Sequence, residues 1–75
     1  MIARTDRWET AQRYYELYEG EDLFGESILV KVWGGKGSGR GRTRTVSGTP
    51  ASLEREKRSI AALRRRHGYV AVMGA

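Results

Sequence analysis

Two stretches of the chain alternate between apolar and polar positions with the period of two that is typical of a β-strand. The first, Arg13–Tyr18, places Tyr15 and Leu17 on one side. The second, Ser27–Trp33, is rich in β-branched residues and is predicted to be a central strand because both its faces are largely apolar. Its two faces carry Ile28, Val30 and Val32 on one side and Leu29, Lys31 and Trp33 on the other.

A helical period of 3.6 residues follows from Pro50 to about His67 and predicts one amphipathic helix. Thr49 can cap its N-terminus, Pro50 suits the first helical position, and Gly68 suits the residue after its end. The stripe predicted to face the core consists of Leu53, Ile60, Leu63 and His67.

The segments between these elements are predicted from their glycines. Gly34–Gly41 holds five glycines and can form a wide turn, after which Arg42–Ser47 can return as an antiparallel strand. That strand would place Arg42 and Arg44 on one face. Tyr69–Val72 is predicted to be a short closing strand or an extended tail.

Two other segments lack a clear period. Met1–Gln12 mixes charges and is expected to be a loose arm anchored by Trp8, while Leu23 and Phe24, within the glycine-containing break Glu19–Gly25, are expected to fold back onto the core. The predicted fold is therefore α+β, a small twisted antiparallel β-sheet packed on one amphipathic α-helix. It forms a single domain over residues 13–75, preceded by an arm over residues 1–12.

Composition and charge narrow the function classes. A chain of 75 residues without cysteine is expected to be one small domain in a reducing cytoplasm, with no disulfide and no zinc thiolate site. No apolar stretch is long enough to predict a membrane span. Residues 1–30 carry three Arg against seven carboxylates, a balance of −4, whereas residues 31–75 carry eleven Lys or Arg against two, a balance of +9. This asymmetry favours a phosphate-bearing partner, although basic residues also serve solubility.

The candidate binding residues lie around the glycine-rich turn. Trp33 ends an apolar strand beside glycines and cations, so it can offer a stacking surface for a base or sugar; alternatively, it caps the small core. The cations expected to neutralise phosphates are Lys31, Lys36, Arg40, Arg42 and Arg44. The alternative for this turn is a flexible hairpin tip with solvated charges.

A second set of cations follows the helix face opposite its apolar stripe. This set, either a second phosphate-contacting surface or a solvated face, consists of Arg55, Arg58, Arg65 and Arg66. His67 has neither a cysteine nor a second histidine with which to form a metal site. The glycine-rich turn lacks the Lys-Ser/Thr pair of a nucleotide-binding loop, and the residues predict no catalytic pair, metal or cofactor.

Several short motifs are spread along the chain, namely the Trp33–Gly34 pair, YYEL at 14–17, LFG at 23–25, Gly37, Gly41 and Gly68–Tyr69. Together they resemble the WGR domain, a small module found alone in bacteria and inside poly(ADP-ribose) polymerases that respond to DNA damage. Gly35 replaces the arginine that gives the motif its last letter, Lys36 stands where the family usually has an apolar residue, and Ser27 replaces a common aromatic. The resemblance implies that Trp33 packs against the sugar at a DNA 5′ end.

These observations predict a non-catalytic nucleic-acid-binding module, with DNA favoured over RNA by the resemblance. The alternative is a protein-interaction adaptor that docks on an acidic or DNA-processing partner. The acidic first part and the basic second part would also permit head-to-tail self-association. No membrane, cofactor or small-molecule substrate is expected.

Overall fold

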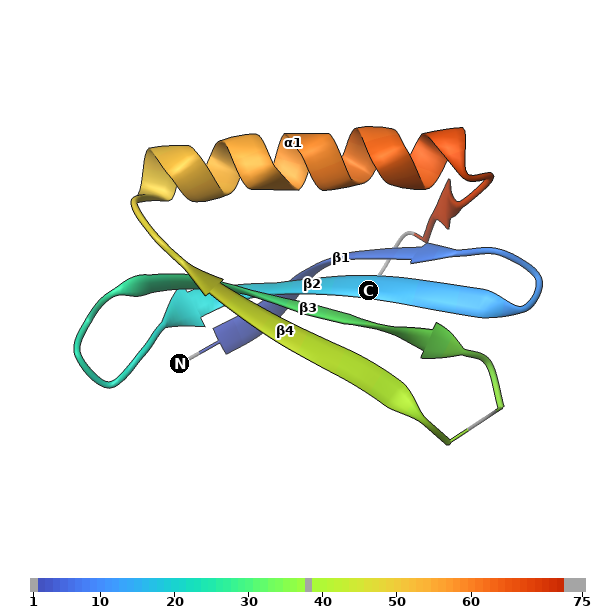
Figure 1. Cartoon of the computed structure of the whole chain (residues 1–75), viewed down its shortest axis with the longest axis horizontal. Helices are drawn as coiled ribbons and strands as arrows, with labels where there is room; N and C mark the ends of the chain where they lie inside the picture. Colours follow the sequence, from blue (N-terminus) through green and yellow to red (C-terminus); the bar gives the residue numbers. More distant parts are fainter. Residues whose placement is uncertain (1, 38, 73–75) are drawn as a thin grey trace.

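The computed structural model describes residues 2–37 and 39–72, which form a five-stranded antiparallel sheet with one helix lying across one of its faces (Figure 1). Residues 1, 38 and 73–75, which belong to the expected arm, turn and domain, lie outside the described residues. The strands follow the order β4-β3-β2-β1-β5. The elements are β1 (Ile2–Glu9), β2 (Arg13–Glu21), β3 (Ser27–Gly35), β4 (Gly41–Ser47), α1 (Pro50–Arg66) and β5 (Val70–Ala71). The predicted α+β fold is confirmed.

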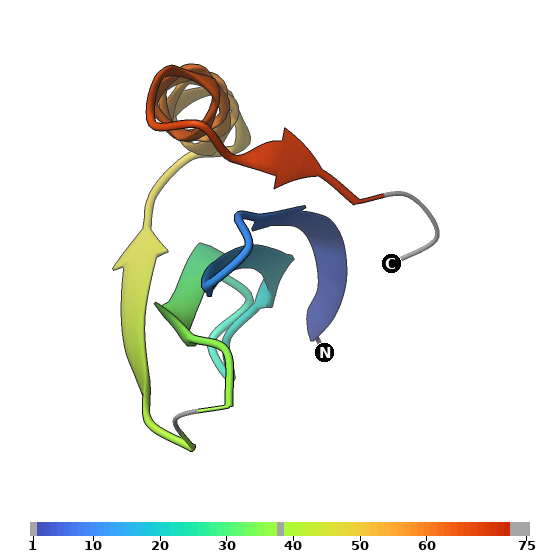
Figure 2. The same cartoon turned by 90° about the vertical axis from the view of Figure 1, so that its right-hand side faces the viewer.

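The first four strands form a meander in which each strand pairs with the next. β5 pairs with β1 at the other edge of the sheet. Figure 2 views α1 nearly end-on, with β5 beside the helix and the other strands below it. The register pairs Tyr15 with both Trp8 and Trp33, and these three residues therefore share the face that α1 covers.

The expectation of a loose N-terminal arm is wrong for Ile2–Glu9, which forms β1 between β2 and β5. The expected anchor, Trp8, is buried. The register shifts between Arg4 and Asp6, and this irregularity interrupts the regular alternation of the side chains between the two faces of the sheet. Backbone pairing and ion pairs hold β1 in the sheet. Neither kind of interaction can be predicted from hydrophobic periodicity.

The core lies between α1 and the sheet. Leu17 and Leu29 are fully buried, and burial of a leucine side chain contributes about 1.5–3 kcal/mol. The buried apolar residues are Trp8, Tyr15, Leu17, Leu29, Leu53 and Ile60. The predicted helix stripe is thus right for Leu53 and Ile60 but wrong for Leu63 and His67, which are exposed. In the last turn of α1, the side chain that lies on the sheet aromatics is Arg64, with its guanidinium 4.4 Å from the ring centre of Tyr15.

The ends of α1 follow the predicted signals. The Thr49 hydroxyl accepts a hydrogen bond from the Ser52 amide at 3.1 Å, and Pro50 begins the helix. After the helix, Gly68 has a φ of +81°, and the Tyr69 amide donates to the Arg64 carbonyl at 2.9 Å. This C-terminal turn directs the chain back toward the sheet, where Tyr69 packs against the core.

The turn between β2 and β3 differs from the prediction. Leu23 and Phe24 do not fold onto the core; they are 99% and 93% exposed. The reason is the side chain of Asp22, whose Oδ1 accepts hydrogen bonds from the amides of Phe24 and Glu26, each at 2.9 Å. Gly25 completes the turn with a φ of +78°. This local network fixes the loop away from the sheet.

Candidate nucleic-acid interface

Trp33 is held by its partners on both neighbouring strands. It pairs with Tyr15 on β2 and with Arg42 on β4, so all three side chains lie on the same face of the sheet. The indole stacks on the Tyr15 ring with a centroid distance of 5.9 Å and an interplanar angle of 15°. Tyr15 also meets Trp8 edge to face, with a distance of 6.3 Å between the two ring centroids. Trp33 is therefore the outermost ring of an aromatic row that begins in the core.

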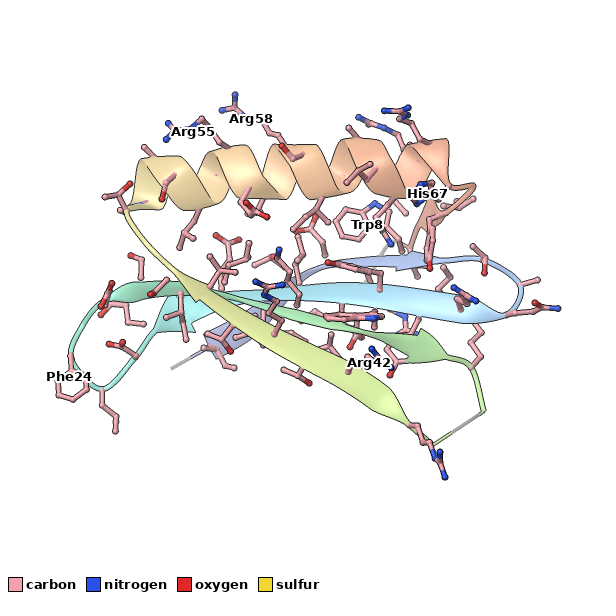
Figure 3. The ribbon with its side chains drawn as sticks, viewed as in Figure 1. Trp8, Phe24, Arg42, Arg55, Arg58 and His67 are labelled. Carbon is pink, nitrogen blue, oxygen red and sulfur yellow. The ribbon has the colours of Figure 1, made fainter. Side chains whose placement is uncertain are left out.

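Beside Trp33 lies a cleft of about 570 Å³, which we call the Trp33 cleft. It is lined by Trp33, Gly34, Gly39, Arg40, Gly41 and Arg42. Figure 3 labels Arg42 on β4, on the part of the strand that leads to the hairpin tip. The volume falls within the range of small-ligand sites, and the lining combines one aromatic ring, peptide backbone and two cations. Such a lining suits an anionic ligand with a flat group.

Two glycines shape the cleft, because an added side chain would clash with the backbone at one of them and would have to displace the Tyr14 hydroxyl at the other. A Cβ on Gly34 would lie 2.8 Å from the Arg40 carbonyl oxygen, and one on Gly41 would lie 2.8 Å from the Tyr14 hydroxyl. β3 and β4 therefore approach closely here, with peptide groups forming part of the wall. Tyr14 closes this point from the opposite face of the sheet, where Arg7 lies over its ring at 5.0 Å.

A smaller cleft of about 220 Å³ also borders Trp33 and Gly34, and it is lined in addition by Arg13, Gly35 and Tyr69. The sequence analysis missed Arg13 and Arg64 as neighbours of the Trp33 region. Arg64 lies over both Tyr15 and Tyr69, at 4.4 and 5.0 Å from the ring centres. Its position four residues after the buried Ile60 is the signal that could have placed it on the sheet side of the helix.

Two of the predicted phosphate contacts are engaged in ion pairs. Lys31 lies beneath α1, where its Nζ is 2.9 Å from Glu56 Oε1. Lys36 Nζ is 2.6 Å from Glu9 Oε1, and this hydrogen bond, with a second from Arg7, lowers the pKa of Glu9 below its ordinary 4.5. Both lysines thus have a carboxylate that offsets their charge.

The β4 arginines are placed differently. Arg42 and Arg44 share one face of the strand, as predicted, and both are exposed. Their pairing with Trp33 and Lys31 shows that this is the helix-side face of the sheet. Neither arginine has an ion pair with the residues that the structure describes. Arg40 is exposed and lines the Trp33 cleft. The structure therefore brings Trp33, Arg40 and Arg42 together, with Arg44 two residues further along β4.

The helix arginines form a separate surface. Arg55 and Arg58 point away from the sheet in Figure 3, and Arg65 and Arg66 are exposed in the last turn. Their charge is favourable near the helix C-terminus because it complements the helix dipole. Arg55 and Arg58 therefore lie on the side of α1 that faces away from the sheet and from Trp33.

Comparison of the chain with known protein families, curated proteins and solved structures finds no match in any of the three. Over residues 2–37 and 39–72, no group of three or more His, Asp or Glu side chains could hold a metal ion. The described part of the chain also has no helix long and apolar enough to cross a membrane.

Proposed function

We propose that the chain is a non-catalytic nucleic-acid-binding module whose binding surface is the Trp33 cleft. The observation that carries this proposal is the pairing of Trp33 with Arg42 across β3 and β4, in a cleft that Arg40 also lines. One aromatic ring and two cations then face the same volume. This is the combination that lets a protein bind a base or sugar and its phosphate together.

The aromatic row gives the stacking surface its rigidity. Because Tyr15 stacks behind Trp33 and is itself buried against Trp8, the indole is held before a ligand arrives. A base stacked on such a ring contributes about 1–3 kcal/mol. Arg42 and Arg44 alternate along β4, Arg40 directly precedes that strand, and all three would neutralise phosphates without reading base identity.

DNA is the first ligand to test, because the resemblance to the WGR domain implies contact with a 5′ end. That resemblance stays a prediction, as does a location in the cytoplasm. RNA and single strands offer the same phosphate and base chemistry and are therefore tested in parallel.

Fluorescence anisotropy with labelled oligonucleotides measures the proposed binding. The ligands are duplex DNA with and without a 5′ phosphate, single-stranded DNA, and RNA, each titrated across a salt series. Arg42→Ala should weaken binding and reduce the slope of log K against log salt by about 0.7–0.9, the value for one phosphate contact. Arg55→Ala removes the same charge from the far side of α1 and should change neither quantity as much.

Trp33→Leu tests the stacking step, and its thermal melt shows whether the fold survives. A folded variant that binds about 5- to 150-fold more weakly would support stacking, since this range corresponds to ~1–3 kcal/mol. Absence of binding by the wild-type chain to all four ligands at low salt would overturn the proposal. Equal effects of Arg42→Ala and Arg55→Ala would reassign the binding to diffuse positive charge.

A further inference from the structure

Two large apolar side chains stand in solvent at the turn between β2 and β3. Leu23 and Phe24 are 99% and 93% exposed and adjacent in sequence. Isolated apolar side chains on a surface need no explanation, but two adjacent ones at the tip of a turn form a contiguous apolar patch that can dock on a partner. We refer to Leu23 and Phe24 as the apolar tip.

The apolar tip is presented by a rigid turn. In addition to the two hydrogen bonds accepted by the Asp22 side chain, the Asp22 amide donates to the Glu26 carbonyl at 2.9 Å, and the Gly25 amide donates to the Asp22 carbonyl at 3.1 Å. Figure 3 shows Phe24 projecting away from the sheet. Because these hydrogen bonds fix the backbone of the turn before binding, little backbone entropy is lost when the side chains that it carries dock.

Charge around the apolar tip restricts its partner. The turn and the strand ends beside it carry Glu19, Glu21, Asp22 and Glu26, of which Glu19 is paired with Lys57. This negative charge would repel phosphates and anionic lipid headgroups. The tip therefore fits an apolar pocket bordered by cations.

The chain itself contains a pocket of that kind. The Trp33 cleft offers an indole ring and backbone for an apolar side chain, with Arg40 and Arg42 as cations. Phe24 and Trp33 could pair as aromatic rings while Glu21 or Glu26 meets the arginines. Both surfaces are thus present in every molecule.

One molecule cannot bring its own tip and cleft together. The apolar tip lies in the turn between β2 and β3, and the Trp33 cleft lies at the turn between β3 and β4. The nine residues of β3 run between these two turns, which therefore lie at opposite ends of the molecule (Figure 1). A contact between two molecules would therefore be head-to-tail. Such a contact uses two different surfaces and can be repeated along a chain of molecules.

We propose that the chain associates with itself head-to-tail, with the apolar tip of one copy occupying the Trp33 cleft of the next. This inference goes beyond the proposed nucleic-acid binding and does not require it. The contact is small, so the affinity should be weak and sensitive to salt.

Sedimentation velocity of the purified full chain tests the association without any nucleic acid. The weight-average sedimentation coefficient should rise with protein concentration up to about 1 mM at low salt, the range for contacts of this size. Phe24→Ser alters an exposed side chain and should raise the dissociation constant about tenfold or more. Arg42→Glu should do the same by changing the charge of the cleft. Arg55→Glu makes the same charge change away from the cleft and is the matched control.

Mixing the two variants gives the decisive result. Phe24→Ser retains an intact cleft and Arg42→Glu retains an intact apolar tip, so an equimolar mixture should form pairs that stop at two chains. A wild-type chain that stays monomeric, or a mixture in which no pairs form, would overturn the inference. So would an Arg55→Glu effect as large as that of Arg42→Glu.

Nucleic-acid binding is measured separately by anisotropy on the Phe24→Ser variant. Because the apolar tip lies away from the cleft, this variant should retain wild-type affinity for the oligonucleotides. Failure of self-association with binding retained would remove only the present inference. Failure of binding with self-association retained would remove only the proposed function.

Discussion

Replacing Glu16 with Gln should destabilise the protein although the change lies on the face of the sheet opposite α1. Glu16 is 7% exposed, and its Oε2 lies 2.6 Å from an Arg4 nitrogen and 2.6 Å from an Arg7 nitrogen. The Tyr18 hydroxyl donates to Oε1 at 3.2 Å. Burial by itself would raise the pKa of Glu16, but these hydrogen bonds outweigh it and lower the pKa below its ordinary 4.5.

The expected loss at neutral pH is about 2 kcal/mol of unfolding free energy. A hydrogen bond to a charged group contributes about 1.5–3 kcal/mol, and Gln keeps the shape of the side chain and one carbonyl acceptor. Arg4 and Arg7 keep partial access to water, with side chains 32% and 23% exposed, so the loss should fall short of the 3–5 kcal/mol typical of breaking a fully buried pair.

The pH dependence supplies the specific signature. Since folding lowers the pKa of Glu16, its stabilising contribution is complete above the ordinary value of 4.5 and disappears as the pH falls through the folded-state pKa. Urea unfolding followed by tryptophan fluorescence should therefore show a difference between wild type and Glu16→Gln at neutral pH. The two curves should converge in acid, where the wild-type carboxyl is protonated.

Glu54→Gln is the matched control, because Glu54 is 52% exposed and its contact with Lys57 is 3.9 Å long. It removes the same charge and should change stability little. A Glu16→Gln difference that persists undiminished in acid would show that the loss comes from packing rather than charge. The reasoning would also fail if Glu16→Gln were as stable as wild type at neutral pH.

Three further predictions concern the fold. Leu29→Ala, at a side chain with no exposed surface, should cost about 2–5 kcal/mol in urea unfolding, whereas Phe24→Ser should cost almost nothing; equal costs would contradict the described core. Thr49→Ala should lower stability by about 1 kcal/mol and Thr49→Ser should restore most of it, because the hydroxyl caps the Ser52 amide; a neutral Thr49→Ala would refute the cap. Gly34→Ala should destabilise the protein by about 1–3 kcal/mol, since the new Cβ would lie 2.8 Å from the Arg40 carbonyl oxygen. In a heteronuclear spectrum the amide shifts should be confined to β3 and β4, and shifts elsewhere would contradict a strain located in this hairpin.

Local signals account for the elements that were predicted correctly. Ser27–Trp33 combines β-branched residues with alternation, and the structure extends it only to Gly35. Thr49 and Pro50 mark the helix start by their own hydrogen-bonding chemistry. In these places the chain's immediate neighbours determine the conformation, so a sequence pattern is enough to predict it.

Long-range partners account for the errors. Ile2–Glu9 becomes a strand because β2 and β5 pair with it. Its two arginines, Arg4 and Arg7, also form ion pairs with Glu16 of the neighbouring strand. Within the candidate site, Trp33, Arg40 and Arg42 are brought together as the sequence suggested, but the engagement of Lys31 by Glu56 depends on where α1 crosses the sheet. The prediction that Phe24 lies in the core rested on its hydrophobicity alone, whereas the hydrogen bonds accepted by Asp22 hold the turn, and Phe24 with it, in solvent.

The pairing of β5 with β1 has a consequence for the order of folding. β1 to β4 form from consecutive hairpins, whose loops are short and quickly closed, while the Trp8–Ala71 and Glu9–Val70 pairs join opposite ends of the described chain. Contacts of such high contact order form late and, when they are as few as here, open first. The Val72 amide, which donates to the Arg7 carbonyl at 2.9 Å, should exchange with solvent far faster than the amides of β2 and β3. The meander would then be the stable unit, with β5 opening and closing over its edge.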